Sequence, residues 1–517
     1  LITAIQSMSN DLVELHKNNW DGIWIRIATN FMLIARLQEF DLIVGNPPWV
    51  KWEHLPSNYA SKIKELCNIR HIFSTRGRFG GTQLNICALI SNVTATNWLT
   101  NTGVLAFLMP DSIMSQNSYE EFRYFYLDYE AKERLFLQKI DKWEKPLKPF
   151  TCEDIVVSQD FNTYYYSRKE VDYKKGIDVT TISRTKGIPD IVLNKETSFA
   201  KVKKHLIFGK KIAAQMSDAT SAFSYLSDVH DFRKIIGDSA YEYRTGVEFT
   251  PQELYMLIGI GKSSTSSHYR FMNKKFTRSK YIVDDMPKNG WELPTDHIYP
   301  IVTGPSLTPF RCNLENEYCI LPYSENKTDA PIGISELMTS NPELFEYLLN
   351  HQNLIDNQSD KSKVMRRGEE FYALSKIGPY TFSKYLVAAR DNTKFCATVI
   401  EPQNTPWGET KQSICVKHTM IIGRTVAGRF IEKEEAYYIA GILNSNIVIQ
   451  YMQSTFKSNG YSLKKSHFYL PEFDQTNPLH KEICKLAKKA SKLTDPAKIA
   501  IIQSKLSDVY LNLCSSR

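Results

Sequence analysis

The chain lacks the patterns that mark several broad protein classes. Its nine cysteines are scattered, without a Cys-x-x-Cys pair or a histidine at zinc spacing, so we predict neither a disulfide framework nor a metal site. No apolar run reaches the roughly 18–20 residues that cross a bilayer, and no signal peptide opens the chain. Repeats and low-complexity tracts are also lacking. We therefore expect reduced thiols, a cytoplasmic location and no membrane partner.

Two patterns that would suggest other chemistry are incomplete. Residues 259–263 are similar to a phosphate-binding loop, but that loop requires a glycine where the chain has Met256. Residues 110–111 with 130–132 fit a restriction-nuclease pattern, yet Glu130 falls in a segment of helical spacing, whereas the pattern needs carboxylates on neighbouring strands. No His-Glu-x-x-His or Gly-x-Ser-x-Gly motif indicates a hydrolase.

Composition describes an ordinary globular protein with a basic balance. The 517 residues suffice for two or three domains, with 42% hydrophobic and 23% charged residues. Lys and Arg number 64 against 56 Asp and Glu, which gives a net charge of +8. This excess suits a polyanionic partner such as nucleic acid but does not require one.

A sharply bounded motif occupies residues 41–49, Asp-Leu-Ile-Val-Gly-Asn-Pro-Pro-Trp. Residues 41–45 are too short and too uniformly apolar for an amphipathic helix, which favours a buried strand of a parallel sheet. Pro47 and Pro48 then end the strand because each lacks an N–H group. The residues that follow are presented at the carboxyl edge of the sheet, where open α/β folds place their ligands.

This tetrapeptide has the chemistry to hold a nucleobase. The side-chain oxygen of Asn46 and the backbone carbonyl of Pro47 can both accept hydrogen bonds from one exocyclic amino group. Trp49 offers a flat face to the ring that carries the amine, while Pro48 holds the turn. A purine turned out of a DNA stack would be held in this way, by its edge and its face. The alternative interpretation is a surface turn after a strand.

Residues 40–56 resemble motif IV of the adenine-specific DNA methyltransferases. More narrowly, they are similar to the large fused restriction–modification and phage-defence methylases, in which Trp often replaces the last Tyr. Residues 80–110 resemble the helix-then-strand segment of that family, and residues 118–123 resemble its continuation. Segments that resemble the target-recognition half of the family follow at 243–247, 298–306, 422–424 and 437–446.

The resemblance implies a site-specific enzyme that transfers a methyl group from S-adenosylmethionine to the N6 atom of a flipped adenine, without a metal. It assigns the catalytic role to Asn46, Pro47, Pro48 and Trp49. It also implies that Phe150 covers the other face of the base and that Asn85 lies near the methyl donor. Core packing for Phe150 and helix capping for Asn85 are open alternatives.

We expect an α/β fold in which the second half of a Rossmann-like methyltransferase sheet precedes a mixed α+β target-recognition domain and a helical C-terminal tail. The expected parts are the catalytic part at 1–170, a connecting segment at 171–240, the recognition domain at 241–475 and the tail at 476–517. Apolar spacing predicts helices at 57–70, 84–99, 122–140 and 478–513, and strands at 104–109, 154–161 and 163–167. The tail packs either on a partner or on the domain itself.

Double-stranded DNA is the partner that this family implies. Cations near aromatic residues supply candidate phosphate contacts, namely Arg270, Lys274, Lys275, Arg278, Lys464 and Lys465. Each cluster has a solvated protein face as its alternative interpretation, and so does the lysine-rich run at 201–211, which we expect on a helix.

The first residue is Leu, and only 45 residues precede Asn46. In the family, the glycine-rich loop that binds S-adenosylmethionine lies well upstream of the tetrapeptide, and no Phe-x-Gly-x-Gly occurs here. We therefore expect an N-terminally truncated piece that requires the missing part of the same protein or a complementary subunit. The alternative is a catalytically inert DNA-binding specificity module of a restriction system.

Overall fold

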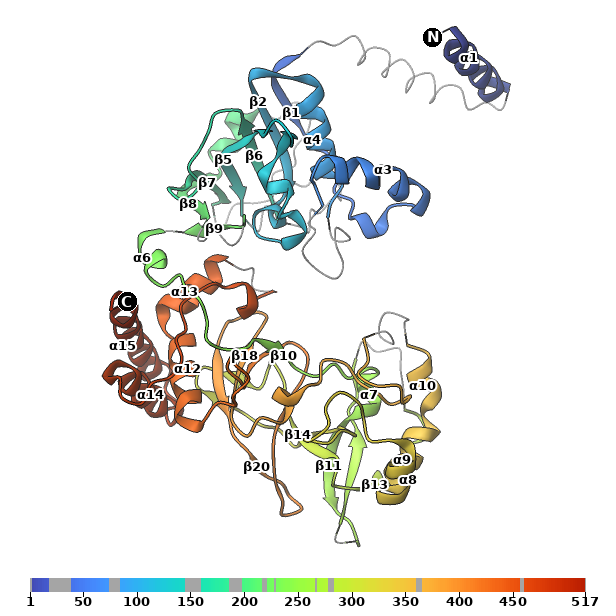
Figure 1. The fold of residues 1–517 in the computed structure, drawn as a ribbon, viewed down its shortest axis with the longest axis vertical. Coiled ribbons are helices and arrows are strands. Elements are labelled where there is room, and N and C mark those ends of the chain that lie inside the picture. The colour runs from blue at the N-terminus through green and yellow to red at the C-terminus, as the bar shows by residue number, and fades with distance from the viewer. Residues whose placement is uncertain are drawn as a thin grey trace. The chain divides into compact units, whose positions relative to one another are not determined.

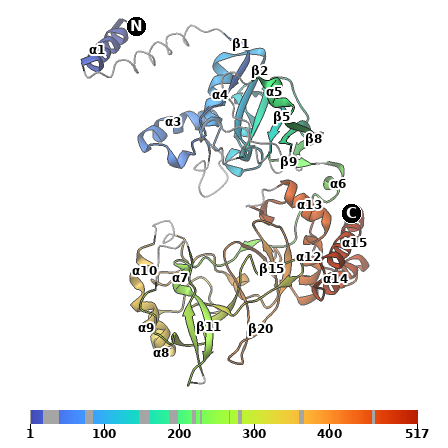
Figure 2. The same cartoon turned by 180° about the vertical axis from the view of Figure 1, so that it is seen from behind.

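The computed structural model describes residues 2–17, 39–73, 84–144, 160–185, 198–215, 221–226, 229–265, 267–277, 283–358, 365–455 and 460–516. The chain divides into two compact units, Leu1–Ser227 and Asp228–Arg517 (Figures 1 and 2). The four predicted domain ranges stay predictions, and each unit is described below by itself.

Unit 1 is built on a seven-stranded mixed sheet of order β1-β2-β6-β5-β7-β8-β9 (Figure 1). Its strands are β1 (Phe40–Gly45), β2 (Leu99–Pro110), β5 (Phe136–Trp143), β6 (Phe161–Ser167), β7 (Ile177–Arg184), β8 (Leu206–Gln215) and β9 (Phe223–Leu226). The pairs β1–β2 and β5–β7 are parallel, and the other neighbours are antiparallel. A separate hairpin joins β3 (Tyr126–Asp128) to β4 (Glu133–Arg134).

The helices of unit 1 include one, α4, that leads directly into β2 and packs against it. They are α1 (Ile2–Lys17), α3 (Ser57–Ile69), α4 (Cys87–Trp98) and α5 (Phe199–Lys203), with short turns η1 (Trp52–His54), η2 (Asp111–Met114), η3 (Asn117–Tyr119) and η4 (Phe122–Tyr124). Cys87 and Leu89 of α4 share one core with Leu105 and Phe107 of β2. The predicted helices at 57–70 and 84–99 and the predicted strands at 104–109 and 163–167 are confirmed.

The predicted helix at 122–140 is wrong, because the chain there forms η4, the β3–β4 hairpin and the start of β5. Phe125 and Lys132 have φ angles of 47° and 57°, which a right-handed helix does not accommodate. Glu130 therefore lies in the turn of a hairpin and not in a helix. Of the charged residues in this segment, Glu130 and Lys132 lie in the turn.

Strand β1 exists as predicted, but it is not buried. Leu42 is 61% exposed and Val44 is 71% exposed. Leu42 and Val44 point to the same face of the strand, and the described residues leave that face uncovered. Within the described residues, β2 is also the only strand that pairs with β1, so the other edge of β1 is open. Strands of parallel sheets normally have both faces covered, and this one does not.

The lysine-rich run at 201–211 also differs from the expectation of a helix. It spans the end of α5 and the first part of β8, where Lys210 and Lys211 pair across the sheet with β7. Alternation along a strand therefore places successive side chains of the run on opposite faces, which divides its charges.

Unit 2 contains a six-stranded sheet of order β13-β12-β11-β17-β14-β22 and a four-stranded sheet of order β10-β23-β18-β19. The strands of the first sheet are β11 (Met256–Lys262), β12 (His268–Asn273), β13 (Trp291–Pro294), β14 (Ile298–Val302), β17 (Glu317–Ile320) and β22 (Ile414–Cys415). Those of the second are β10 (Arg244–Thr245), β18 (Leu386–Arg390), β19 (Ala397–Ile400) and β23 (Thr419–Ile422). Two-stranded pairs join β15 (Leu307–Thr308) to β16 (Arg311–Cys312) and β20 (Gln403–Asn404) to β21 (Thr410–Lys411).

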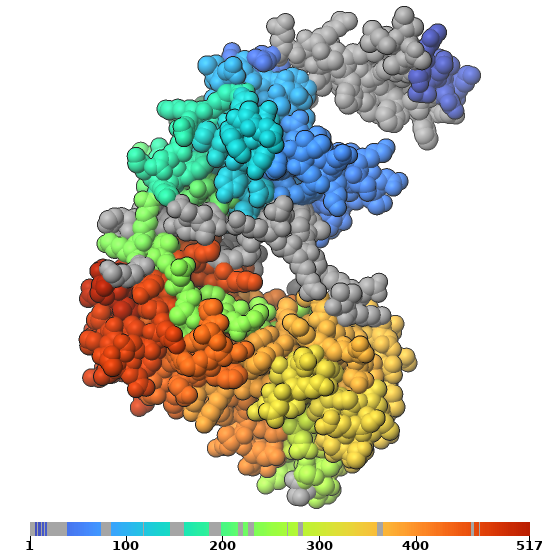
Figure 3. Space-filling view, in the orientation of Figure 1, coloured from blue at the N-terminus to red at the C-terminus, as the bar shows by residue number. Residues whose placement is uncertain are grey.

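Helices lie beside these sheets and form the C-terminal end of the unit (Figure 1), and Figure 3 shows the C-terminal residues, in red, gathered on one side of the unit. They are α6 (Val229–Lys234), α7 (Gln252–Tyr255), α8 (Ile334–Ser340), α9 (Pro342–Asn350), α10 (Gln352–Asp356), α12 (Lys433–Leu443), α13 (Asn446–Thr455), α14 (Pro478–Ser491) and α15 (Pro496–Ser515), with turns η6 (Pro379–Phe382) and η7 (Leu463–Lys465). Residues 259–262 lie in strand β11, which a phosphate-binding loop would not form.

The predicted helical tail is confirmed as α14 and α15, and it docks on its own unit through α12. Gly441 makes the close approach of α12 and α14 possible, because a Cβ atom there would lie 2.6 Å from a methyl carbon of Ile483. The side of α14 that faces α12 buries Ile483, Ala487 and Ala490. Of the two expectations for the tail, packing on the domain is the one observed.

Asn444 ends α12 and fastens it to the four-stranded sheet. Its buried side chain donates to the carbonyls of Ala397 (2.6 Å) and Ala440 (2.9 Å), and its Oδ1 accepts from the N–H of Ala397 (3.0 Å). The amide thus pairs with both backbone groups of the first residue of β19, much as a neighbouring strand would.

The Asn444→Ala change should lower the free energy of unfolding of unit 2 by about 1–3 kcal/mol, because the buried N–H of Ala397 would lose its partner, while the carbonyl of Ala397 would keep the hydrogen bond from the N–H of Phe310. Urea denaturation followed by circular dichroism measures this loss. Asn353→Ala on α10 removes an exposed amide of the same kind and should change stability by less than about 0.5 kcal/mol. Equal losses in the two variants would contradict the role of Asn444.

Candidate functional site

The Asn-Pro-Pro-Trp tetrapeptide lies directly after β1, at the carboxyl end of that strand. Gly45, the last residue of β1, pairs with Phe107 of the parallel strand β2, so both strands end at the same edge. Pro47 is buried, whereas Asn46 and Pro48 are exposed. The Asn46 side chain forms no hydrogen bond with the part of the chain that the structure describes. Its carboxamide is therefore available at this edge.

The backbone after the tetrapeptide is tied to the start of α4. Ile86 N donates to the carbonyl of Val50 (2.9 Å), and Trp52 N donates to the carbonyl of Leu84 (2.7 Å). Lys51 and Asn85 face each other in the antiparallel bridge between these bonds. The loop that carries Asn46 is thus held at both ends, by β1 before it and by this bridge after it.

Trp49 is fixed by a hydrogen bond and by a neighbouring ring. Its indole N–H donates to the carbonyl of Leu108 near the end of β2 (3.2 Å), and its ring centroid lies 5.7 Å from that of Phe161. The ring of Trp143 follows, 6.3 Å from Phe161. Phe161 begins β6 and Trp143 ends β5, so all three residues lie at the same edge of the sheet. We call Trp49, Phe161 and Trp143 the aromatic row.

A buried polar network holds the end of β2 beside the aromatic row. Asp111 Oδ1 accepts hydrogen bonds from Asn162 Nδ2 and from the hydroxyl of Tyr225, both at 2.9 Å. The hydroxyl of Tyr164 donates to the carbonyl of Pro110 (2.8 Å). Burial, and secondly the charge of Asp111, raises the pKa of Tyr164 and Tyr225 well above the usual value. Both hydroxyls therefore stay protonated and remain donors.

The sequence alone predicts Asn46, Pro47, Pro48 and Trp49 at the carboxyl edge of the sheet, but it does not predict the other residues there. In the sequence, Asp111 stands out only as part of an incomplete nuclease pattern. Phe161 and Trp143 could have been noticed as aromatic residues at the ends of strands, but only the pairing of β5, β6 and β2 places them beside Trp49. Phe150, which the resemblance assigns to the other face of the base, lies outside the described residues.

Asn85 is only 2% exposed, and its Oδ1 lies 3.5 Å from the N–H of Cys87 at the start of α4. This contact agrees with the capping alternative for Asn85. A side chain so buried does not offer a surface to S-adenosylmethionine, and no glycine-rich loop stands among the described residues. These residues do not by themselves fit a methyl donor.

The predicted DNA-contacting cations are not brought together. Arg270 lies on β12 and donates through Nε to the carbonyl of Lys262 (3.0 Å). Lys274 forms an ion pair with Glu317, which neutralises its charge. Lys275 and Lys464 are exposed on separate elements. Arg278 and the side chain of Lys465 lie outside the described residues, and the role of all six in DNA binding stays a prediction.

Within the described ranges, no helix has the length and apolar character that a bilayer crossing requires. Nor does any group of three His, Cys, Asp or Glu side chains in those ranges form a set that could hold a metal ion.

No curated protein matches the chain, whereas several solved structures show low similarity to it. Among them are the ATP-dependent Type ISP restriction-modification enzyme LlaBIII bound to DNA (TM-score 0.38), a nuclease-deletion mutant of the Type ISP enzyme LlaGI with a DNA substrate mimic (0.38) and a DrdV–DNA complex (0.36). Each is 10% identical over 87% of this chain, which covers 29%, 41% and 44% of their respective lengths. The chain thus spans less than half of each of these proteins.

A family model locates the similarity in the sequence more directly. Residues 4–139 match the Eco57I restriction-modification methylase family. The matched segment contains β1, the tetrapeptide, α4 and β2. This part of the chain is therefore similar to a restriction-modification methylase.

Proposed function

We propose that the chain carries the base-holding half of a site-specific DNA adenine N6-methyltransferase of a restriction–modification or phage-defence system. The observation that carries the proposal is the Asn46 carboxamide, which is exposed and without a hydrogen-bond partner in the described structure, at the carboxyl edge beside Trp49. The match of residues 4–139 to a restriction-modification methylase family supports DNA methylation as the reaction.

The tetrapeptide makes a poor nucleophile reactive. The amino nitrogen of adenine has its lone pair delocalised into the ring. Hydrogen bonds accepted by the Asn46 side chain and the Pro47 carbonyl draw the amino protons out of the ring plane and localise that lone pair. Because no covalent intermediate is required, most of the rate enhancement comes from positioning. The two anchors of the loop, at β1 and at the bridge to α4, supply that positioning.

The aromatic row supplies the face contact for the extruded base. A base that leaves the duplex loses its stacking, and an aromatic platform replaces part of it. Trp49 is the ring nearest to Asn46 in sequence, and Phe161 buttresses it at 5.7 Å. The hydrogen bond from Trp49 to Leu108 fixes the plane of the indole relative to β2.

S-adenosylmethionine, when bound, supplies the methyl group as a sulfonium that is its own leaving group. The described residues do not form a donor cradle, so we assign this part to a segment beyond them or to a complementary subunit. The open edge of β1, with its exposed Leu42 and Val44, is where such a segment would add strands to the sheet. Double-stranded DNA is the proposed substrate.

A second candidate is a catalytically inert DNA-binding specificity module. The burial of Asn85 favours this second candidate, because a buried Asn85 side chain does not make the contact with S-adenosylmethionine that the resemblance implies. Methyl transfer by the full-length product of the gene distinguishes the two candidates, since only the enzyme incorporates label from S-adenosylmethionine into DNA.

The Asn46→Ala change in that product should lower methyl incorporation by about 1,000-fold, because loss of one oriented acceptor removes stabilisation of the developing charge. DNA affinity, measured in parallel by fluorescence anisotropy, should stay unchanged. Asn58→Ala on α3 removes another exposed amide and should leave both quantities at the wild-type level. Undiminished incorporation by Asn46→Ala would refute the mechanism.

The Phe161→Ala change should reduce methylation by about 10-fold, since base–aromatic stacking contributes about 1–3 kcal/mol. Phe161→Trp, which keeps an aromatic face, should restore most of the activity. Phe136→Ala is the matched control, because Phe136 is also half-buried but lies at the opposite end of β5. If the two alanine variants lose activity equally, the aromatic row has no special role.

A further inference from the structure

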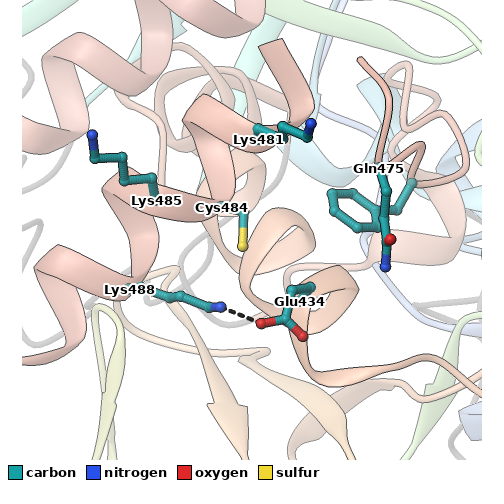
Figure 4. Close-up of a pocket in the computed structure, with 7 residues that line it drawn as sticks. Glu434, Gln475, Lys481, Cys484, Lys485 and Lys488 are labelled. Atoms are coloured by element: carbon teal, nitrogen blue, oxygen red, sulfur yellow. Dashed lines mark hydrogen bonds and ion pairs between the residues drawn. The ribbon is translucent and has the colours of Figure 1, made fainter. Parts of the chain in front are cut away.

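A cavity of about 530 Å³ lies beside α14 in unit 2 (Figure 4). Lys481, Lys485 and Lys488 of α14 line it, together with Phe473 and Gln475. Neither the tetrapeptide nor the predicted DNA-contacting cations belong to this cavity. It therefore has no part in the site described above.

The lysines form a row along one face of α14. Lys481, Lys485, Lys488 and Lys492 follow one another at intervals of four, three and four residues, which places them on one side of a helix. At 1.5 Å per residue the row extends over about 16 Å. We call these four residues the lysine row. The opposite side of α14 is buried against α12, so the row cannot turn inward.

The charges of the row are only partly neutralised. Lys488 forms an ion pair with Glu434 of α12, which Figure 4 shows as a dashed line. Across the described ranges, neither Lys481 nor Lys485 forms an ion pair. Both are exposed. Two lysines whose backbone positions are about one helical turn apart thus border the cavity without an anionic partner among the described residues.

The cavity is built from fixed elements. The ring of Phe473 lies 5.3 Å from that of Tyr438 and 6.1 Å from that of His480. The N–H of Asp474 donates to Nδ1 of the buried His480 (2.9 Å), which fixes the segment that carries Gln475. The cavity wall that Phe473 and Gln475 form is therefore held by contacts with α12 and α14.

We propose that the lysine row binds the phosphate backbone of duplex DNA without regard to sequence. The inference rests on the proposed function, which makes DNA the substrate, and adds a place where the duplex is held. A straight row of like charges suits a polymer whose phosphates repeat every 3.4 Å per strand, along about five base-pair steps. Glu434 competes with DNA for Lys488 and so weakens this contact.

The test measures the affinity of the full-length gene product for a 30-base-pair duplex by fluorescence anisotropy between about 50 and 200 mM salt. Lys481→Ala/Lys485→Ala should make the slope of log affinity against log salt less negative by about 1.8, since each phosphate contact contributes about 0.9. Affinity at the lowest salt should fall by about 10-fold. Lys498→Ala/Lys505→Ala on α15 removes the same net charge and should leave the slope unchanged.

The Glu434→Gln change should alter DNA affinity and its salt dependence in the opposite direction. It releases Lys488 without altering the row, so affinity should rise and the slope should become more negative by about 0.9. An unchanged slope in the Lys481→Ala/Lys485→Ala variant, or equal changes in it and in the α15 variant, would overturn the proposal.

The methylation assay separates the two proposals. If the wild-type protein transfers no methyl group while its DNA affinity depends on Lys481 and Lys485, the lysine row stands and the proposed function fails. If the protein methylates DNA while the slope of log affinity against log salt is the same in the wild type and in the Lys481→Ala/Lys485→Ala variant, the proposed function stands and the DNA-binding role of the lysine row is wrong.

Discussion

The parallel pairing of β1 with β2 is the constraint on which the whole candidate site depends. It brings the carboxyl ends of two strands together, so that the loop with Asn46 starts beside the carbonyl of Leu108, which then accepts the Trp49 indole hydrogen bond. The backbone bonds between residues 50–52 and 84–86 close the loop from the other side. Main-chain bonds, and not exposed side-chain contacts, therefore set the geometry of the tetrapeptide.

Local signals in the sequence were sufficient for the elements that carry the site. The paired prolines marked the end of β1, and apolar periodicity marked α4, the core of β2 and the tail helices. What failed depended on contacts between distant segments. Leu42 is exposed because the described residues leave its face of β1 uncovered, and the aromatic row exists only because β6 returns antiparallel to β2. The predicted helix at 122–140 is wrong because apolar spacing along the chain does not reveal the two left-handed residues, Phe125 and Lys132, at which the backbone turns.

In unit 2, the segment that most resembles the family, residues 437–446, has a structural role. Asn444 in this segment pairs with the backbone of β19. Glu435 of the same helix accepts two hydrogen bonds from Arg429, each at 2.8 Å. Those hydrogen bonds raise the pKa of Arg429 further, so its guanidinium stays charged. Lys274 is likewise neutralised within the unit. Lysines and arginines that form no ion pair within the protein therefore indicate a polyanion-binding surface better than lysines and arginines that form one.

The contact at Gly441 limits how unit 2 can change. Because a Cβ atom at residue 441 would lie 2.6 Å from a methyl carbon of Ile483, the two helices can keep this distance only while residue 441 has no side chain. One residue inserted into α14 before its lysines would turn them by about 100° around the helix axis and carry them away from the cavity. An insertion in the loops that flank α12 and α14 would leave the register of the two helices, and hence the position of the lysines, unchanged.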